Sequence, residues 1–410
     1  MDRRLFLLLS VAGVANPGST PLRSGGSAVV QSGDPNFDAW AADYIARAIQ
    51  SGLPAPVVDR EFRGLTPDRD VVARDSQQPE FSKPISEYVQ SVAADGRVDA
   101  GRKKMAATPA LGQIEARFGP PPEILVSIWG VESAFGRLQG DFDVLRSLAS
   151  LAAAGRRRAW AESQLDALIR IIASGKATRA ELRGSWAGAM GQTQLEPDTY
   201  LDLAIDLRGG DRPDVWRSAD DALASAAHLL QNGGWRRGEP WQREVRLPSG
   251  FDYGLAEGPT KSAAAWDSQD GIKPATGAGW AHTDADTVLI LPAGAAGPAF
   301  LAYPNHFVIR KYNNSLAYAL GVGLLADRIA GRSRLAQPWP KEEPLSIADR
   351  VGAQSALNKL GYDAGPADGQ VGIKTRVALR AWQKSQKLPA DGYLTPHVAG
   401  VLVAQASRAP

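Results

Sequence analysis

The chain has 410 residues, of which 44% are hydrophobic and 22% charged, so it can form a folded protein of two or three domains rather than a disordered chain. Its formal net charge of +2 excludes the strong positive field expected of a nucleic-acid-binding protein. Because the chain has no cysteine, disulfides, thiolate chemistry, thiolate metal sites and a lipid-modified cysteine anchor are also excluded.

The N-terminus has the order of a secretory signal peptide. Met1–Arg4 is basic, Leu5–Leu9 is apolar, and small residues follow as far as Ala15, so residues 1–15 are predicted to be the signal. The pair Arg3-Arg4 also matches the twin-arginine export pattern. No segment reaches the roughly 18 uninterrupted apolar residues of a membrane span. The sequence therefore predicts a periplasmic protein without a membrane span, exported by the general secretory or the twin-arginine route.

Residues 16–36 are rich in Gly, Ser and Pro and are predicted to be a flexible tether. From residue 37 to residue 330 the chain is predicted to form one mainly helical domain, because apolar residues recur at helical spacing. The expected helices are Asp38–Ile49, Ile85–Ala94, Ile124–Phe135, Val144–Ala153, Ala159–Ile172, Ala219–Leu230 and Ser315–Ile329.

A small β element is expected inside this domain, which makes the fold class mainly α (α+β). The short apolar runs Val288–Leu291 and Phe307–Ile309, bounded by Pro292 and Pro304, are typical of strands. Residues 331–345 contain three prolines and mixed charge and are predicted to be a linker.

Residues 346–404 are predicted to form a small helical domain with an internal duplication. Pro366–Gly369 returns as Pro389–Gly392, and each copy precedes a threonine, Thr375 or Thr395, that is expected to cap the next helix. Helices are expected near residues 353–360 and 374–386. Their apolar side chains predict a modest core of Leu357, Leu360, Val377, Leu379 and Trp382.

Glu132 is a carboxylate at the end of a segment with almost no other polar side chain. Leu125, Ile128 and Trp129 lie on its face of the expected helix, and the other faces are apolar too, which is typical of a buried helix. Partial desolvation would raise the pKa of Glu132 toward that of a working general acid. The alternative is a buried carboxylate held by a structural partner.

A second unusual stretch is Gly184–Tyr200. Its small residues permit close approach of a ligand or another backbone, and Ser185, Gln192 and Gln194 supply uncharged groups suited to sugar hydroxyls. Trp186 is the tryptophan best placed for stacking on a sugar. The alternative interpretation is a tight interhelical turn with exposed polar residues.

Three separated motifs resemble the lytic murein transglycosylase B family over residues 37–330. They are GVESAFG around Glu132, the run GSWAGAMGQTQLEPDTY, and Tyr312-Asn313 followed by Tyr318. The C-terminal segments LGYDAGPADGQVGIKT and RAWQKSQKLPADG are similar to a small helical peptidoglycan-binding domain. The resemblance implies a lysozyme-like catalytic domain joined to a domain that binds peptidoglycan strands.

The implied reaction is cleavage of the bond between N-acetylmuramic acid and N-acetylglucosamine without water. Glu132 matches the residue that acts first as acid and then as base on the sixth-carbon hydroxyl, which leaves a 1,6-anhydro end. The substrate acetamide would stabilise the oxocarbenium-like centre.

The resemblance also implies supporting roles. Ser185 matches a serine that hydrogen-bonds the catalytic glutamate, and Gln194 matches a glutamine of the glycan groove. Tyr312, Asn313 and Tyr318 match the far wall of that groove, with Tyr88 a further candidate. The alternatives are that Ser185 and Gln194 brace a turn and that Asn313 caps a helix.

No metal or other cofactor is predicted. The four histidines are too dispersed for metal spacing, and His228 is expected to be a satisfied core residue. Some family members carry an acidic calcium loop where this chain has Asp206–Asp220. Here Arg208, Gly210 and Arg212 stand at alternating positions where oxygen ligands are required, so no calcium site is expected.

Two other functions remain open. A hydrolytic muramidase would need a second carboxylate about 5 Å from Glu132 for retention, or about 6.5–9.5 Å away for inversion. Asp141, Asp143 and Glu196 are the candidates. A non-catalytic scaffold that binds glycan through both domains is the alternative from a different class.

Overall fold

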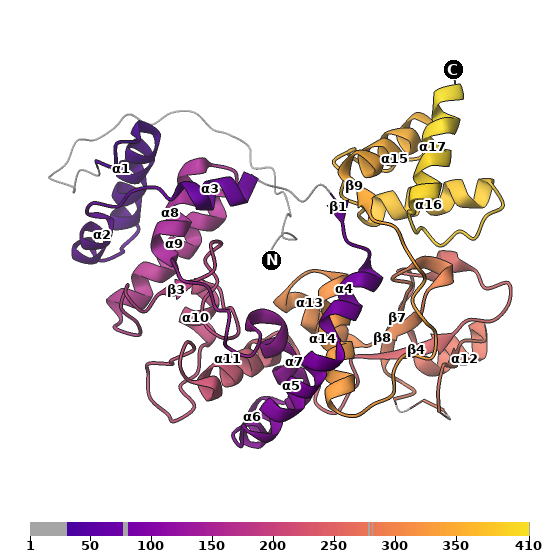
Figure 1. The fold of residues 1–410 in the computed structure, drawn as a ribbon, viewed down its shortest axis with the longest axis horizontal. Coiled ribbons are helices and arrows are strands. Elements are labelled where there is room, and N and C mark those ends of the chain that lie inside the picture. Colours follow the sequence, from indigo (N-terminus) through magenta and orange to yellow (C-terminus); the bar gives the residue numbers. More distant parts are fainter. Residues whose placement is uncertain (1–30, 77–80, 278, 281, 410) are drawn as a thin grey trace. The chain divides into compact units, whose positions relative to one another are not determined.

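The computed structural model describes residues 31–76, 81–277, 279–280 and 282–409. The predicted signal peptide and most of the predicted tether lie outside these residues. The described chain folds into 17 α-helices and nine short strands (Figure 1). Among these residues, none of the helices combines the length and the apolar character that a membrane crossing requires. The predicted class, mainly helical with a small β element, is confirmed.

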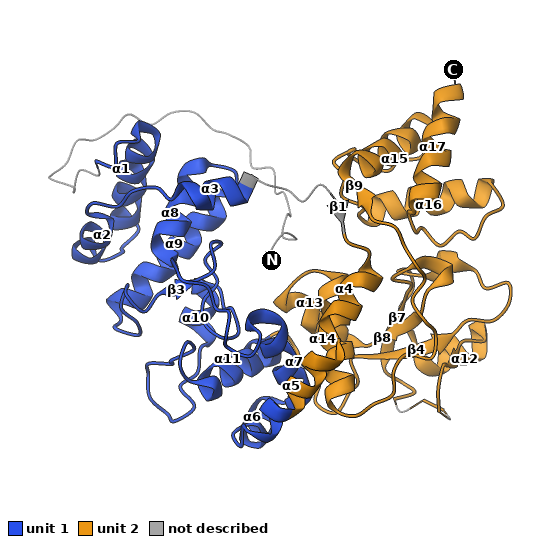
Figure 2. Cartoon of the chain, viewed as in Figure 1, with its two compact units in different colours: residues 1–78, 103–232 blue, residues 79–102, 233–410 orange. Residues whose placement is uncertain are grey.

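The chain divides into two compact units (Figure 2). The first unit comprises residues 1–78 and 103–232, and the second comprises residues 79–102 and 233–410. Helix α5 (Asp95–Ala106) carries the chain from one unit into the other. The C-terminal domain falls within the second unit, together with the sheet.

The first unit is helical apart from one short strand pair. Its helices are α1 (Pro35–Gln50), α2 (Ala55–Phe62), α3 (Arg69–Ser76), α6 (Leu111–Phe118), α7 (Pro122–Ser133), α8 (Val144–Ala154), α9 (Arg158–Ala173), α10 (Pro197–Leu203) and α11 (Ala219–Asn232). Strands β2 (Phe142–Asp143) and β3 (Arg183–Gly184) pair antiparallel, with Phe142 opposite Gly184. Asp143 then caps α8, because its carboxylate accepts the Arg146 N–H at 3.2 Å.

The second unit contains a five-stranded antiparallel sheet in the order β5-β7-β8-β4-β6. The strands are β4 (Gln242–Arg246), β5 (Lys261–Ser262), β6 (Lys273–Pro274), β7 (Asp286–Ile290) and β8 (Ala299–Ala302). Trp266 of α12 (Ala263–Asp270) is fully buried in the cluster that covers the sheet. The predicted strand at Val288–Leu291 is confirmed as β7, which pairs with β8 in the middle of the sheet.

The remaining helices of the second unit are α4 (Ile85–Val92), α13 (Pro304–Tyr312), α14 (Leu316–Ile329), α15 (Ile347–Lys359), α16 (Ile373–Ser385) and α17 (Pro396–Arg408). The predicted strand at Phe307–Ile309 is wrong, because these residues lie within α13. Pro304 occupies the first turn of that helix, a position proline favours. A run of three apolar residues has too few positions to separate the helical period from the strand period.

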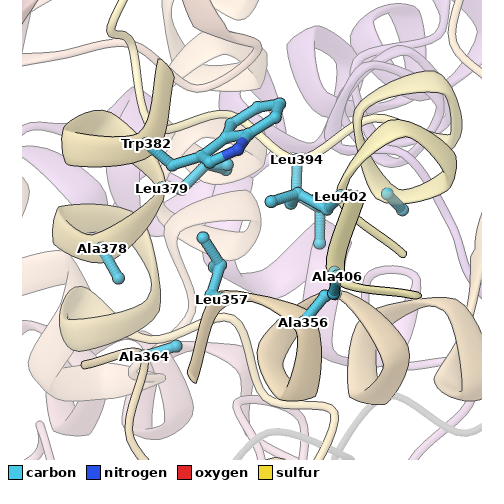
Figure 3. Close-up of a cluster of buried hydrophobic side chains, with 11 residues drawn as sticks. Ala356, Leu357, Ala364, Ala378, Leu379, Trp382, Leu394, Leu402 and Ala406 are labelled. Atoms are coloured by element: carbon cyan, nitrogen blue, oxygen red, sulfur yellow. The ribbon is translucent and has the colours of Figure 1, made fainter. Parts of the chain in front are cut away.

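The C-terminal domain has its own core of buried side chains on α15, α16 and α17 (Figure 3). Leu357, Leu379 and Trp382 are buried as predicted and Leu360 packs against them, but Val377 is 55% exposed, so its assignment to the core was wrong. Strand β9 (Leu345–Ser346) precedes the domain and pairs with β1 (Phe81–Ser82).

The two copies of the internal duplication have the same hydrogen-bond pattern in the structure. Gln354 of α15 accepts the Gly369 N–H at 2.8 Å and donates to Asp368, and Gln383 of α16 accepts the Gly392 N–H at 2.8 Å and donates to Asp391. Each copy is thus one helical glutamine that holds one Pro-Ala-Asp-Gly turn.

The two threonines of the duplication differ in role. Thr395 caps α17 by accepting the Val398 N–H at 3.2 Å, as predicted. Thr375 lies inside α16, whose N-cap position is Gly372. Its buried hydroxyl donates to the Ala364 carbonyl instead, so the capping prediction for Thr375 was wrong.

Candidate active site

Helix α7 places Glu132 on its last turn. Nine of its twelve residues are buried, which confirms the predicted buried helix, whereas Glu132 itself is partly exposed. Pro121 and Pro122 begin the helix, and Ala134 ends it in a left-handed conformation with φ of 50°. A carboxylate at such a point is carried by rigid scaffold while it still reaches solvent or a ligand.

The chain turns sharply directly after Glu132. Ala134, Phe135 and Gly136 have φ values of 50°, 62° and 84°, a run of left-handed residues that is rare outside glycine. The Phe135 ring folds back onto the helix and meets the Trp129 ring edge-on at 5.8 Å. A Cβ at Gly130 would lie 2.7 Å from the Phe135 ring, so this packing requires glycine there.

A buried hydrogen-bond network ties this turn to the second motif. The Trp129 indole donates to Gln192 Oε1 at 3.0 Å, and the Ser133 hydroxyl donates to the Gln192 carbonyl at 2.5 Å. The Gly136 N–H in turn donates to Ser133 Oγ at 2.8 Å, while Gln192 Nε2 donates to the Trp216 carbonyl at 3.3 Å. Residues on both sides of Glu132 are therefore held by Gln192.

In the second motif, Gly184–Tyr200, Ser185 and Ala189 form two hydrogen bonds with each other. The Ser185 N–H donates to the Ala189 carbonyl at 2.8 Å, and the Ala189 N–H donates to Ser185 Oγ at 3.1 Å. A Cβ at Gly184 would lie 2.1 Å from the Ala189 carbonyl oxygen, and one at Gly140 would lie 2.2 Å from the Gly184 carbonyl oxygen. The small residues of the motif thus permit backbone-to-backbone contact, and the role of Ser185 toward Glu132 stays a prediction.

Gln194 is buried in the same loop with φ of 53°. Its side-chain amide donates to the Gln139 carbonyl at 2.9 Å and to the Gly191 carbonyl at 2.8 Å. Both of these hydrogen bonds shape the loop, and the role of Gln194 toward a glycan stays a prediction.

Sequence reasoning missed most of the side chains that support this site. Gln192 was interpreted as a sugar ligand, but its amide joins Trp129 to the Trp216 backbone. Gln139 also donates to the Trp216 carbonyl, at 3.0 Å. Trp186, interpreted as a stacking platform, is only 5% exposed and is therefore a core residue. The pairing of Gly130 with Phe135 was detectable, because a glycine inside an apolar helix indicates close approach of another group.

The segment predicted to lack calcium is organised by a buried carboxylate. Asp221 accepts the Leu207 N–H at 3.1 Å and the Asp214 N–H at 2.9 Å. Arg212 and Arg217 lie 3.6 Å and 4.0 Å from the Glu181 carboxylate. Across the described residues, no three His, Cys, Asp or Glu side chains gather into a possible metal site. The absence of calcium remains a prediction.

One of the three candidate second carboxylates has a clear structural role. Asp143 caps α8 and also accepts Arg179 at 2.9 Å, so it is held by its own helix and a guanidinium. Asp141 is exposed, and Glu196 occupies the N-cap position of α10.

The predicted far-wall residues all lie in the second unit. The rings of Tyr312 and Tyr318 stack with centroids 6.4 Å apart and an interplanar angle of 10°. Tyr88 of α4 lies against α14, because a Cβ at Gly321 would be 3.1 Å from its ring. The structure therefore groups Tyr312 with Tyr318. Tyr88, which belongs to α4, contacts α14 near Gly321, one turn after Tyr318.

Asn313 ends α13 rather than capping the next helix. It is the C-cap residue of α13, while the Ser315 hydroxyl accepts the Tyr318 N–H and caps α14. Its Oδ1 is buried and has no hydrogen-bond partner within the described structure. The helix-cap alternative for Asn313 is thus excluded for α14, and an acceptor is available at this position.

His306 is fully buried on α13, stacked on Trp241 at 6.1 Å. Neither ring nitrogen has a partner among the described residues. Burial, together with the nearby Arg310 guanidinium, lowers the pKa of His306 to about 3. The ring is therefore neutral at physiological pH. His228, in contrast, bonds the Leu203 carbonyl at 2.9 Å, so it has the partner that was expected, although it is half-buried and not a core residue.

Comparison with known proteins gives the class. The model of the transglycosylase SLT domain family matches residues 36–327, and that of a putative peptidoglycan-binding domain matches residues 347–402. Since the first match covers most of the chain, the protein belongs to the transglycosylase SLT domain family, a family of enzymes. The resemblance inferred from the three motifs and from the C-terminal repeat is confirmed.

Particular relatives narrow this class to the lytic transglycosylases. The chain is 31% identical over 223 residues to membrane-bound lytic murein transglycosylase B of Escherichia coli (strain K12), and the match spans 54% of this chain and 60% of that relative. The crystal structure of SltB3 from Pseudomonas aeruginosa in complex with NAG-anhNAM-pentapeptide has 41% identity and a TM-score of 0.86, covering 90% of this chain and 100% of SltB3.

A second solved structure is more distant. Soluble lytic transglycosylase SltB1 from Pseudomonas aeruginosa is 26% identical with a TM-score of 0.63, over 71% of this chain and 98% of that one. The predicted lysozyme-like fold with a C-terminal peptidoglycan-binding domain is confirmed.

Proposed function

We propose that this protein is an exported lytic transglycosylase that cleaves the bond between N-acetylmuramic acid and N-acetylglucosamine in peptidoglycan and leaves 1,6-anhydro ends. The observation that carries the proposal is the position of Glu132, one partly exposed carboxylate on the last turn of a buried helix, with its neighbours on both sides tied to Gln192. Family membership and the solved complex of SltB3 with an anhydro product support the same reaction.

In the first step the Glu132 carboxyl gives its proton to the glycosidic oxygen, and the bond to C1 of the muramic acid breaks. The substrate acetamide oxygen stabilises the positive centre at C1. In the second step the Glu132 carboxylate takes the proton of the C6 hydroxyl, whose oxygen bonds to C1. The carboxyl group is protonated again, so each turnover returns the enzyme to its starting state.

The supporting residues have separate roles in this scheme. The Ser185 hydroxyl accepts the Ala189 N–H and keeps its own proton, which it can donate to Glu132 in the carboxylate state. Gln194 would line the glycan groove, as its match to the family's groove glutamine implies. Tyr312 and Tyr88 would offer ring faces to the glycan, and Asn313 Oδ1 an acceptor, while the buried Tyr318 would support Tyr312 from behind.

The proposal is tested by mass spectrometry of purified peptidoglycan digested with the mature protein. Soluble products with 1,6-anhydro ends are expected, and Glu132→Gln should release none while it still sediments with insoluble peptidoglycan. Reducing ends would identify a hydrolytic muramidase and overturn the proposal. No product from the wild-type protein, with binding retained, would identify a scaffold.

A further inference from the structure

The C-terminal domain makes a charged contact with the sheet of the second unit. Glu257 Oε2 accepts Arg376 Nε at 2.7 Å and Arg380 Nη2 at 3.0 Å, and both arginines lie one turn apart on α16. The Glu257 N–H donates to the Leu289 carbonyl of β7 at 2.8 Å, so this carboxylate is fixed to the sheet. The three side chains are between 13% and 28% exposed, so the ion pair is largely shielded from water.

A second contact uses the repeated turn. Asp391 accepts the Ala295 N–H at 2.8 Å with one oxygen and holds its own turn with the other, through Gln383 and the Tyr393 N–H at 2.9 Å each. Gly294 has φ of 64°, and a Cβ there would lie 2.5 Å from Asp391 Oδ2. The absence of a side chain at residue 294 is what allows the turn to reach the backbone next to the sheet.

The two copies of the duplication differ in this respect. Asp368, the counterpart of Asp391, accepts Gln354 and the Gln370 N–H, all within the C-terminal domain. Its turn is otherwise built in the same way. The second copy has therefore added a contact outside the domain to a turn that needs none for its own structure.

The segment predicted to be a linker, residues 331–345, also makes hydrogen bonds to the rest of the second unit. The N–H groups of Ala336 and Gln337 each donate to the Glu244 carboxylate of β4 at 2.8 Å. Closer to the domain, Glu342 accepts the Tyr393 hydroxyl. Hydrogen bonds near both ends of this segment restrict how far it can move.

We infer that Glu257 and Asp391 are positioning residues that lock the peptidoglycan-binding domain onto the sheet, so that the domain holds a glycan strand in one orientation instead of acting as a mobile anchor. This inference rests on the proposed function. A locked domain offers the bound strand to the enzyme at a high effective concentration, which a released domain on a linker of this length would lower. Removing Glu257 would also leave two shielded guanidinium groups without their carboxylate.

Limited trypsin digestion tests the lock directly, since Arg332, Arg334 and Lys341 are cleavage sites between the sheet and the domain. Glu257→Gln and Asp391→Asn should be cut there at least about tenfold faster than the wild type, with release of the C-terminal domain. Asp368→Asn is the matched control for the turn, and the exposed Glu343→Gln is the control for the charge; both should resist like the wild type. Equal resistance of all four variants would overturn the lock.

Enzyme kinetics test whether the locked domain improves the use of insoluble peptidoglycan. On insoluble peptidoglycan the two lock variants should show a KM raised by about three- to tenfold, whereas kcat on a short soluble glycan and binding of the released domain to peptidoglycan should be unchanged. Variants that are cut rapidly but keep the wild-type KM would overturn the positioning role. Loss of anhydro products from the wild type would instead contradict the proposed function, so the two failures are distinguishable.

Discussion

Two regions differ in whether their polar side chains have hydrogen-bond partners: the turn after Glu132, and the tyrosine group at the junction of α13 and α14. Around Glu132, the side chains of Ser133, Gln192 and Gln194 bond to the backbone of neighbouring loops. In the second unit, buried polar atoms of His306 and Asn313 have no partner in the described part of the chain. The first region is organised internally before any ligand binds, whereas the second keeps buried polar groups without compensation.

This difference predicts where function and stability respond to substitution. Changes around Glu132 should disturb the geometry of a reacting group and lower kcat. Changes in the second region should alter affinity or pH dependence and leave kcat nearly intact.

The largest effect is expected for Glu132→Gln. The amide cannot transfer a proton, so kcat should fall by about 10²- to 10⁴-fold with little change in the melting temperature. Turnover of a soluble glycan followed by chromatography measures the loss, and Glu123→Gln, on the first turn of the same helix, is the control. Activity within threefold of the wild type would remove Glu132 from the mechanism.

A pH effect is expected from His306 in the second region. Its pKa of about 3 lies below that of an unfolded histidine, so between about pH 6.5 and pH 3 the unfolded chain binds a proton that the folded chain does not. Stability should therefore fall as the pH falls through this window, by up to about 1.4 kcal/mol per pH unit from this residue.

Urea denaturation at pH 7 and pH 5 measures this contribution. His306→Leu should reduce the difference between the two pH values, and the exposed His397→Leu should leave it unchanged. The same pH difference in His306→Leu and the wild type would show that the ring is charged or solvated in the folded protein.

Gln192→Met should destabilise the first region by about 1–3 kcal/mol, because the buried Trp129 indole N–H loses its acceptor. Since Glu132 lies between Trp129 and Ser133, kcat should also decrease. Urea denaturation and soluble-glycan kinetics measure the two effects. Gln90→Met, an exposed change of the same type on α4, is the control. An unchanged free energy of unfolding would mean that the network around Gln192 is not formed.

The smallest effect is expected for Tyr312→Leu. Loss of the stack on Tyr318 should cost about 0.5–1.5 kcal/mol of stability, and KM should increase several-fold with kcat unchanged. Tyr362→Leu in the C-terminal domain is a control of the same size. A fall in kcat that exceeds the rise in KM would place Tyr312 at the reacting centre and break the contrast between the two regions.

Much of the fold was predictable because it is local. The helices that carry Glu132, the cap at Thr395 and the duplicated turns each depend on residues a few positions apart, so their periodicity and turn residues suffice. Phe307–Ile309 and Thr375 were misassigned for the opposite reason. A short apolar run fits two periods, and a threonine after a turn can serve the core as well as a cap.

The candidate site was predictable only in part. Small residues and a lone carboxylate made Glu132, Ser185 and Gln194 candidates, but they did not show that Gln192 joins Trp129 to the backbone at Trp216. Those partners are separated by 63 and 24 positions along the chain. No periodic signal links residues so far apart, because only loop closure brings them together.

By itself, the sequence determined that one carboxylate ends a buried apolar helix and that a duplicated domain follows a proline-rich segment. Tertiary structure decided how Glu132 is held and whether the C-terminal domain is free. Both outcomes depend on hydrogen bonds between segments that are distant in sequence, such as the bond between Glu257 and α16. These hydrogen bonds are strong because packing shields them from water, and a local sequence pattern does not indicate that packing.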